Sequence, residues 1–147
     1  MKNLIILSLL LLFCCTSKSQ VQKNETQINI QTTLKNNNEV YITFTNKSNS
    51  SVEIKKPCMF NTYIKVQKDD EELNSLIRVK VDPACEYPVS YLNTNNSREY
   101  KFPFKINELY DLKEGEKYSM NVEYYIISNN KLVQKIVSDQ YIFIWKN

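Results

Sequence analysis

Few residues in this chain have side chains suited to catalysis or metal binding. The 147 residues include no histidine, four cysteines and one glycine. Without histidine the chain cannot build a Ser-His-Asp or Cys-His catalytic group or a histidine-ligated zinc site, and it lacks the commonest general base at neutral pH. A single glycine also excludes a glycine-rich phosphate-binding loop. Cysteines and carboxylates remain as the candidates for chemistry.

Two groups of carboxylates are dense enough to be considered as sites. Asp69–Glu72 lacks the alternating spacing of a calcium-binding loop. It belongs to the run KVQKDDEE (65–72), whose charge changes sign as in a solvated hairpin tip; weak calcium binding is the alternative. The other group could supply the acid and base of a glycosidase, but it flanks a predicted surface corner, which favours solubilising charges. Its members are Glu108, Asp111, Glu114 and Glu116. We therefore expect no enzyme activity, no metal site and no cofactor.

The N-terminus predicts export. Residues 1–19 read as a signal peptide, because one positive charge precedes an apolar run too short to span a bilayer. Small residues before Gln20 fit cleavage that releases a soluble protein. Alternatively, Leu12–Cys15 resembles a bacterial lipoprotein box with Cys15 as the lipid-bearing residue, although its two middle positions depart from that pattern. Either route leads to the periplasm, the cell envelope or the medium, with membrane contact only through a lipid anchor.

Export leaves two cysteines, Cys58 and Cys85, inside the domain. In an oxidising compartment an even pair most simply forms a disulfide. Closing a loop of about 28 residues is worth about 3.5 kcal/mol on the chain-entropy model. A proline lies close to each cysteine, so the bridge is expected to tie two loops or strand ends together. A catalytic or metal-binding thiol pair is the alternative.

The charge balance excludes a nucleic-acid partner. The chain carries 19 basic and 16 acidic residues, and Lys2 and Lys18 belong to the leader. The rest is therefore close to neutral, with interspersed charges, and lacks the basic footprint of nucleic-acid binding.

The pattern after the leader predicts one all-β domain over 27–147, preceded by a short flexible segment at 20–26. Apolar and polar residues alternate with period two, and turn-forming residues interrupt them at short intervals. The irregular section 82–98 carries two prolines, 107–112 suggests one helical turn, and Pro103 suggests an edge strand. These features predict an antiparallel β-sandwich of about seven to nine strands. The predicted strands are 28–34, 39–46, 52–55, 61–68, 76–81, 98–106, 118–126, 131–137 and 140–146.

The single glycine lies in DLKEGEKY (111–118), which looks like the corner that links the two sheets of immunoglobulin-like and fibronectin-like domains. There Leu112 would fill the core, Gly115 would take the tight turn and Tyr118 would bond back to the corner backbone. This resemblance covers most of 27–146. Within that superfold, the strand pair 39–56 and the corner resemble small bacterial domains of the intracellular proteinase inhibitor type.

We expect a non-catalytic, monomeric binding protein of the bacterial envelope, such as an inhibitor or an immunity-type protein. Tyr41, Tyr125 and Ile127 fall on the polar side of their strands, and QYIFIW (140–145) is apolar on both sides. These residues could form a protein interface; the alternatives are a central C-terminal strand or a bulge that changes its register.

Two further features bear on recognition. The section 82–98 offers Tyr87 and Tyr91 on a backbone stiffened by the disulfide, either as a recognition loop or as a simple connection. An alternative function is a carbohydrate- or surface-associated accessory domain, which predicts an exposed aromatic platform. The sole tryptophan, Trp145, tests that alternative, and its place near a strand end favours the core instead. The sequence does not identify the binding residues or the partner.

Overall fold

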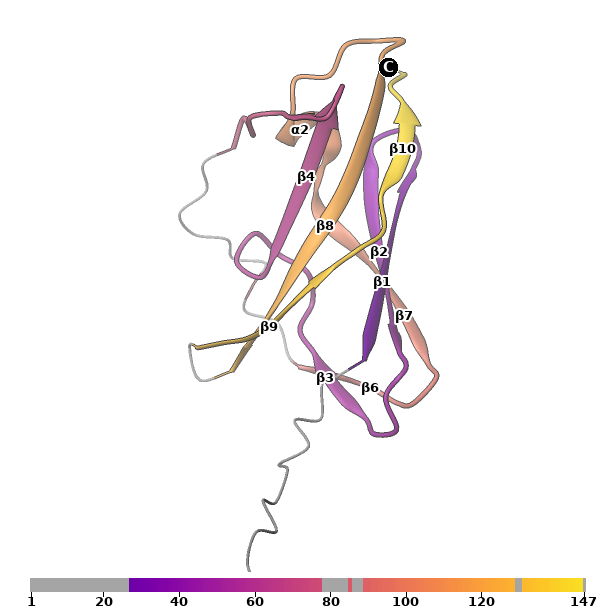
Figure 1. Cartoon of the computed structure of the whole chain (residues 1–147), viewed down its shortest axis with the longest axis vertical. Coiled ribbons are helices and arrows are strands. Elements are labelled where there is room, and N and C mark those ends of the chain that lie inside the picture. Colours follow the sequence, from indigo (N-terminus) through magenta and orange to yellow (C-terminus); the bar gives the residue numbers. More distant parts are fainter. Residues whose placement is uncertain (1–26, 78–84, 86–88, 129–130, 147) are drawn as a thin grey trace, which may run out of the picture.

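The computed structural model describes residues 27–77, 85, 89–128 and 131–146, and these form an antiparallel β-sandwich (Figure 1). The all-β class predicted from the alternation is confirmed: these residues contain ten strands, of which β3, β5 and β6 have only two or three residues. The elements are β1 (Ile28–Lys35), β2 (Glu39–Asn46), β3 (Val52–Ile54), β4 (Thr62–Lys68), β5 (Glu71–Glu72), β6 (Ser90–Leu92), β7 (Ser97–Lys105), α2 (Ile106–Leu109), β8 (Lys117–Ser128), β9 (Lys131–Val137) and β10 (Tyr141–Ile144).

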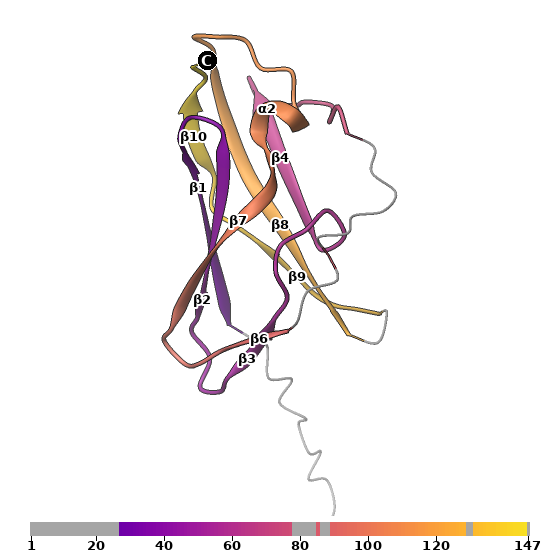
Figure 2. The same ribbon diagram turned by 180° about the vertical axis from the view of Figure 1, so that it is seen from behind.

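Two main sheets face each other, as the views from both sides show (Figures 1 and 2). One has the order β1-β2-β7; the other has the order β10-β8-β4-β5, with β9 also paired to β8. A third, two-stranded sheet joins β3 to β6. Alternate residues of both main sheets meet in one core, where the ring of Phe44 on β2 lies edge-on to Tyr124 on β8 with centroids 4.7 Å apart.

The tight turns use Asn and Asp where glycine is scarce. Asn36 and Asn37 between β1 and β2 have φ of 49° and 65°, as the sequence predicts for this Asn-rich turn. Asp69 and Asp70 between β4 and β5 have φ of 51° and 66°. Short polar side chains tolerate this left-handed region better than others do. The acidic run is therefore the tip of a hairpin.

The corner before β8 has the geometry expected of its sequence. Gly115 has φ of +79°, which a side chain resists, and its N–H donates to the carbonyl of Trp145. The hydroxyl of Tyr118 accepts from the Lys113 N–H at 3.0 Å and donates to Glu116 at 2.8 Å. Leu112 is half-buried against the core rather than fully enclosed. The tyrosine thus ties the corner to the start of β8.

Most strand ends differ from the prediction by one or two residues, and some elements differ by more. Leu76 and Ile77 are not in a strand, and the rest of the predicted strand 76–81 lies outside the described residues. Within 82–98, predicted to be irregular, β6 pairs with β3 because a short alternating stretch, Ser-Tyr-Leu, fits against Val-Glu-Ile. The predicted helical turn at 107–112 is α2, which begins and ends earlier.

Pro103 lies, as predicted, on an edge strand. Within the described residues, β7 pairs with β2 alone. The register of this pair shifts between Glu39 and Tyr41, whose partners Lys105 and Lys101 lie on either side of Pro103, and proline cannot donate a hydrogen bond to a neighbouring strand.

The C-terminal strand is not central. Strand β10 pairs only with β8, at the edge of its sheet. The buried residues near the end of β9 have even numbers, namely Ile136 and Ser138, whereas those in and after β10 have odd numbers, namely Phe143 and Trp145. An irregularity at Asp139 and Gln140 therefore shifts the alternation of inward and outward side chains between the two strands. Ile142 and Ile144 therefore point to solvent, with 56% and 58% of their surface exposed.

Candidate functional site

A cleft of about 450 Å³ lies between β3, the loop that follows it and the end of the β8–β9 hairpin. Its walls combine apolar and polar side chains, the mixture typical of binding pockets. The described residues that line it are Ser50, Ser51, Val52, Glu53, Lys55, Cys58, Phe60, Asn61, Cys85, Tyr124, Tyr125, Ile126, Ile127 and Val133.

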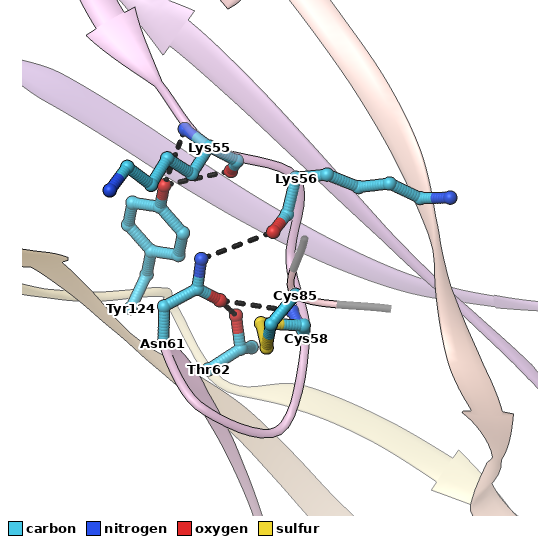
Figure 3. Close-up of a disulfide and its surroundings, with 7 residues drawn as sticks. All are labelled: Lys55, Lys56, Cys58, Asn61, Thr62, Cys85 and Tyr124. Atoms are coloured by element: carbon cyan, nitrogen blue, oxygen red, sulfur yellow. Dashed lines mark hydrogen bonds between the residues drawn. A yellow bond between two sulfur atoms is a disulfide. The ribbon is translucent and has the colours of Figure 1, made fainter. Parts of the chain in front are cut away.

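The predicted disulfide forms one wall of the cleft. Cys58 and Cys85 are bonded, with their Cα atoms 5.5 Å apart (Figure 3). The bridge anchors the loop after β3 to a segment 27 residues further along the chain. Because a crosslink restricts loop motion, this wall of the cleft is held in place covalently.

Asn61 fixes the backbone of the same loop. Its side-chain oxygen accepts from the Cys58 N–H at 2.9 Å and from the Thr62 hydroxyl at 2.7 Å, and its amide group donates to the Lys56 carbonyl at 3.1 Å (Figure 3). Asn61 is only 6% exposed, so these bonds satisfy polar groups that would otherwise be costly to bury. The loop therefore presents a defined surface.

Tyr124 joins this loop to β8. Its hydroxyl accepts from the Lys55 N–H at 3.0 Å and donates to the Lys55 carbonyl at 2.8 Å (Figure 3). Burial raises the pKa of Tyr124 well above its ordinary value, so the hydroxyl stays protonated and able to donate.

Two large apolar side chains at the cleft remain in contact with water. Phe60 is 67% exposed and Val133 is 64% exposed. They come from two different segments, the loop before β4 and strand β9. Exposed apolar side chains on a rigid wall are what a binding partner can cover.

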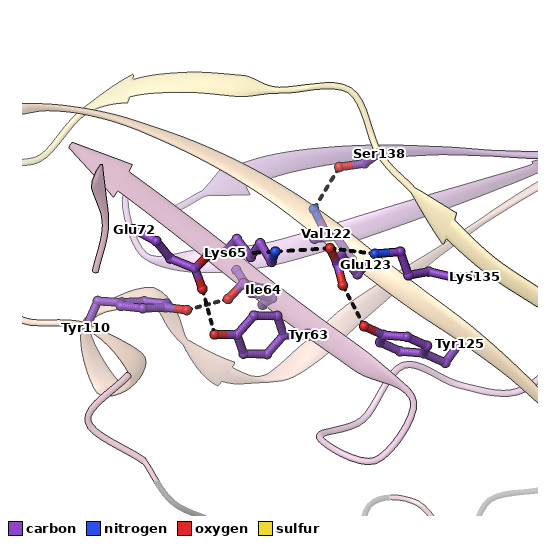
Figure 4. Close-up of polar contacts among 10 residues, drawn as sticks. All are labelled: Tyr63, Ile64, Lys65, Glu72, Tyr110, Val122, Glu123, Tyr125, Lys135 and Ser138. Atoms are coloured by element: carbon purple, nitrogen blue, oxygen red, sulfur yellow. Dashed lines mark hydrogen bonds and ion pairs between the residues drawn. The ribbon is translucent and has the colours of Figure 1, made fainter. Parts of the chain in front are cut away.

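A charged cluster adjoins the cleft on the outer face of β4, β8 and β9 (Figure 4). Glu123 on β8 is 7% exposed and accepts from the Tyr125 hydroxyl at 2.5 Å. Its carboxylate also pairs with Lys65 at 3.1 Å and Lys135 at 3.0 Å. These contacts lower the pKa of Glu123 to about 2, and the hydrogen bond from Tyr125 has the largest effect. Burial alone would raise this pKa. Tyr125 belongs to both the cluster and the cleft wall.

The residues predicted for an interface fall in three places. Tyr125 and Ile127 line the cleft. Tyr41 lies on the other main sheet, where the Lys35 ammonium is 4.2 Å from its ring centre. Tyr91 on β6 is largely exposed, and Tyr87 lies outside the described residues, as do Cys15 and the rest of the leader.

Trp145 is not an exposed platform. Its surface is 3% exposed, and its backbone is bonded to both Gly115 and Glu116 at the corner. Trp145 therefore lies in the core, as its place near a strand end indicated, and a glycan platform built on this ring is not what the structure has.

The carboxylates considered as glycosidase groups have other contacts. Glu108 accepts from the Lys105 N–H at 2.8 Å at the start of α2. Glu116 pairs with Lys68 at 2.7 Å and with the Tyr118 hydroxyl. Asp111 and Glu114 are exposed. Within the described residues, no group of three or more cysteines or carboxylates is placed to hold a metal ion.

Sequence reasoning missed Asn61, Phe60 and Glu123. Asn61 is the first residue of the predicted strand 61–68, and nothing in the sequence marks its side chain as a partner of the preceding loop. Glu123 falls on the polar side of β8, where a solvated carboxylate is expected. The sequence signal for Glu123 was its neighbour: Tyr125 on the same side of the strand is large enough to cover it.

No protein-family model matches the chain, and no curated protein sequence matches it. Among the described residues, no helix has the length and apolar character needed to cross a bilayer.

Proposed function

We propose that this chain is an exported, non-catalytic binding protein of the bacterial envelope, and that the cleft beside the disulfide receives a protein partner. The observation that carries the proposal is the pair of exposed apolar side chains, Phe60 and Val133, that line a cleft of about 450 Å³. Apolar anchors in a preformed pocket usually supply most of the energy of an interface.

The construction of the cleft supports recognition rather than simple packing. The Cys58–Cys85 bridge, the Asn61 hydrogen bonds and the Tyr124 hydroxyl all fix the backbone around it. A surface that is rigid before binding loses little conformational entropy on binding. Such a surface suits a dedicated inhibitor or an immunity-type protein, which must hold one partner tightly.

Export is part of the proposal. The disulfide fits an oxidising environment. The leader at 1–19 supplies the signal, with either release before Gln20 or lipidation at Cys15. Both routes leave the β-sandwich free to meet a partner in the envelope.

The proposal is tested by capture of a partner from the envelope fraction of the native host. The bait is the oxidised chain from Gln20, compared with Phe60→Ala and with Ile144→Ala. Ile144 is exposed on β10 and does not line the cleft, so its variant removes a similar apolar side chain elsewhere. Capture that is lost with Phe60→Ala and kept with Ile144→Ala supports the cleft. Equal capture by all three baits contradicts it.

The alternative function is recognition of glycans. Tyr91 on β6, 66% exposed, is the aromatic side chain that favours it. Binding of envelope polysaccharide that is lost in Tyr91→Ala, with no protein captured, would replace the protein-binding proposal.

A further inference from the structure

Strand β8 continues past the end of its neighbour β4. The two strands are paired from Gln67 with Ser119 to Thr62 with Tyr124. The last backbone bond between them runs from the Tyr125 N–H to the Asn61 carbonyl, at 2.7 Å. β8 goes on to Ser128, and Figure 1 shows the β8–β9 hairpin reaching beyond the start of β4. Within the described residues, no strand pairs with β8 on this side beyond Tyr125, and the edge left there lies beside the cleft.

The alternation of the strand sets which backbone groups face that edge. The Val122 N–H and carbonyl point away from β4, because both are bonded to Ser138. The Tyr125 N–H points toward β4, because it is bonded to Asn61. Since backbone groups alternate along a strand, the N–H and carbonyl of Ile127 point to the β4 side, into the cleft. Ile126 faces β9, where it pairs with Gln134.

The loop before β4 turns away from this edge. The Asn61 N–H bonds the Cys58 carbonyl at 3.2 Å, which closes a tight turn. The disulfide and the Asn61 side chain fix the turn (Figure 3). The loop therefore cannot extend β4 along β8.

The sequence at this edge lacks the usual protection. Exposed strand edges normally carry lysine, proline or a bulge that discourages pairing with other chains. Here the residues are Tyr125, Ile126 and Ile127, and the register shift nearby lies on the β9 side. Phe60 and Val133 flank the edge with apolar surface.

We propose that the cleft takes an extended segment of its protein partner, which adds to β8 as a strand in line with β4. The segment exchanges backbone hydrogen bonds with Ile127 and places an apolar side chain between Phe60 and Val133. This inference rests on the proposed function, because it names how the same cleft binds. An open strand edge favours an extended peptide over a helix, since a helix has already used its backbone hydrogen bonds internally.

The test uses linear heptapeptides displayed on phage, selected on the oxidised chain from Gln20. Enriched peptides are synthesised and measured on the parent protein, on Phe60→Ala and on the control Ile144→Ala. A scan that methylates each peptide nitrogen in turn then removes one backbone donor at a time. We expect binding to fall about tenfold at alternate positions and little at those between, because only every second N–H faces β8.

Amide hydrogen exchange supplies an independent readout. In the free protein the Ile127 amide should exchange faster than the Tyr125 and Ile126 amides, which have partners. Saturating peptide should slow Ile127 at least about tenfold.

Three results would overturn strand addition. The first is slow exchange at Ile127 in the free protein, which would mean that the chain fills the edge itself. The second is cleft-dependent binding with no alternation in the methylation scan and no change at Ile127, which would leave the cleft as a binding site. The third is the absence of any peptide that depends on Phe60. Failure of the proposed function is separate, since it is judged by partner capture.

Discussion

Replacement of Glu123 by glutamine tests the charged cluster on the outer face of β8. Glu123 is nearly buried under Lys65, Lys135 and Tyr125. Its pKa falls from the ordinary value of 4.5 to about 2, and a shift of this size corresponds to about 3 kcal/mol. The two lysines are 29% and 46% exposed, so water screens their charges. We therefore expect Glu123→Gln to lower the free energy of unfolding at pH 7 by about 1–2 kcal/mol.

The pH dependence follows from the direction of the shift. A carboxylate with a lowered pKa in the folded state stabilises fully above its unfolded pKa, near 4.5, and loses this contribution as the pH falls to about 2. The difference between the parent and Glu123→Gln should therefore shrink from pH 5 to pH 2.

Urea denaturation at low ionic strength measures this difference at each pH. Urea is used because guanidinium chloride would screen the ion pairs. The exposed Glu71 at the hairpin end provides the control Glu71→Gln, which changes the net charge equally. Two results would refute the reasoning. One is a loss of unfolding free energy in Glu123→Gln that stays constant down to pH 2, and the other is a loss no larger than that in Glu71→Gln.

Three further predictions concern the cleft wall and the corner. The double variant Cys58→Ser, Cys85→Ser should lose about 3.5 kcal/mol in urea denaturation, because it frees a loop with ends 27 residues apart; an unchanged midpoint would be inconsistent with this. Asn61→Ala should lose about 2–3 kcal/mol by the same assay, since it leaves buried backbone groups without partners, whereas a loss below about 0.5 kcal/mol would contradict the role of Asn61. Gly115→Ala should cost about 1 kcal/mol from φ alone, because a Cβ meets no atom within 4 Å, and a loss above about 3 kcal/mol would point to a clash.

Much of the fold could be predicted from the sequence because the alternation is local. Strands β2 and β9 have the predicted bounds, and β2 is a clean run of alternating residues. The Asn-rich turn before β2 and the corner at Gly115 were also predictable, because only certain residues accept their backbone conformation.

The cleft could not be predicted because it depends on contacts between distant segments. Its open edge exists because β4 starts at Thr62 while β8 runs to Ser128, and period-two patterns locate strand ends poorly. The partner of the Tyr124 hydroxyl, Lys55, lies 69 residues away. The burial of Trp145, by contrast, agrees with its place near a strand end, and the irregularity at Asp139 and Gln140 agrees with the alternative of a bulge that changes the register of QYIFIW.

The most direct test of the central claim is capture of a partner by three forms of the oxidised chain from Gln20: the parent, Phe60→Ala and Ile144→Ala. Phe60 is 67% exposed, so its removal should leave the stability of the fold nearly unchanged, which thermal unfolding checks. The account predicts a stoichiometric partner that the parent and Ile144→Ala retain and Phe60→Ala loses. A partner retained equally by all three forms, or no partner with a folded bait, would contradict a protein-binding cleft beside the disulfide.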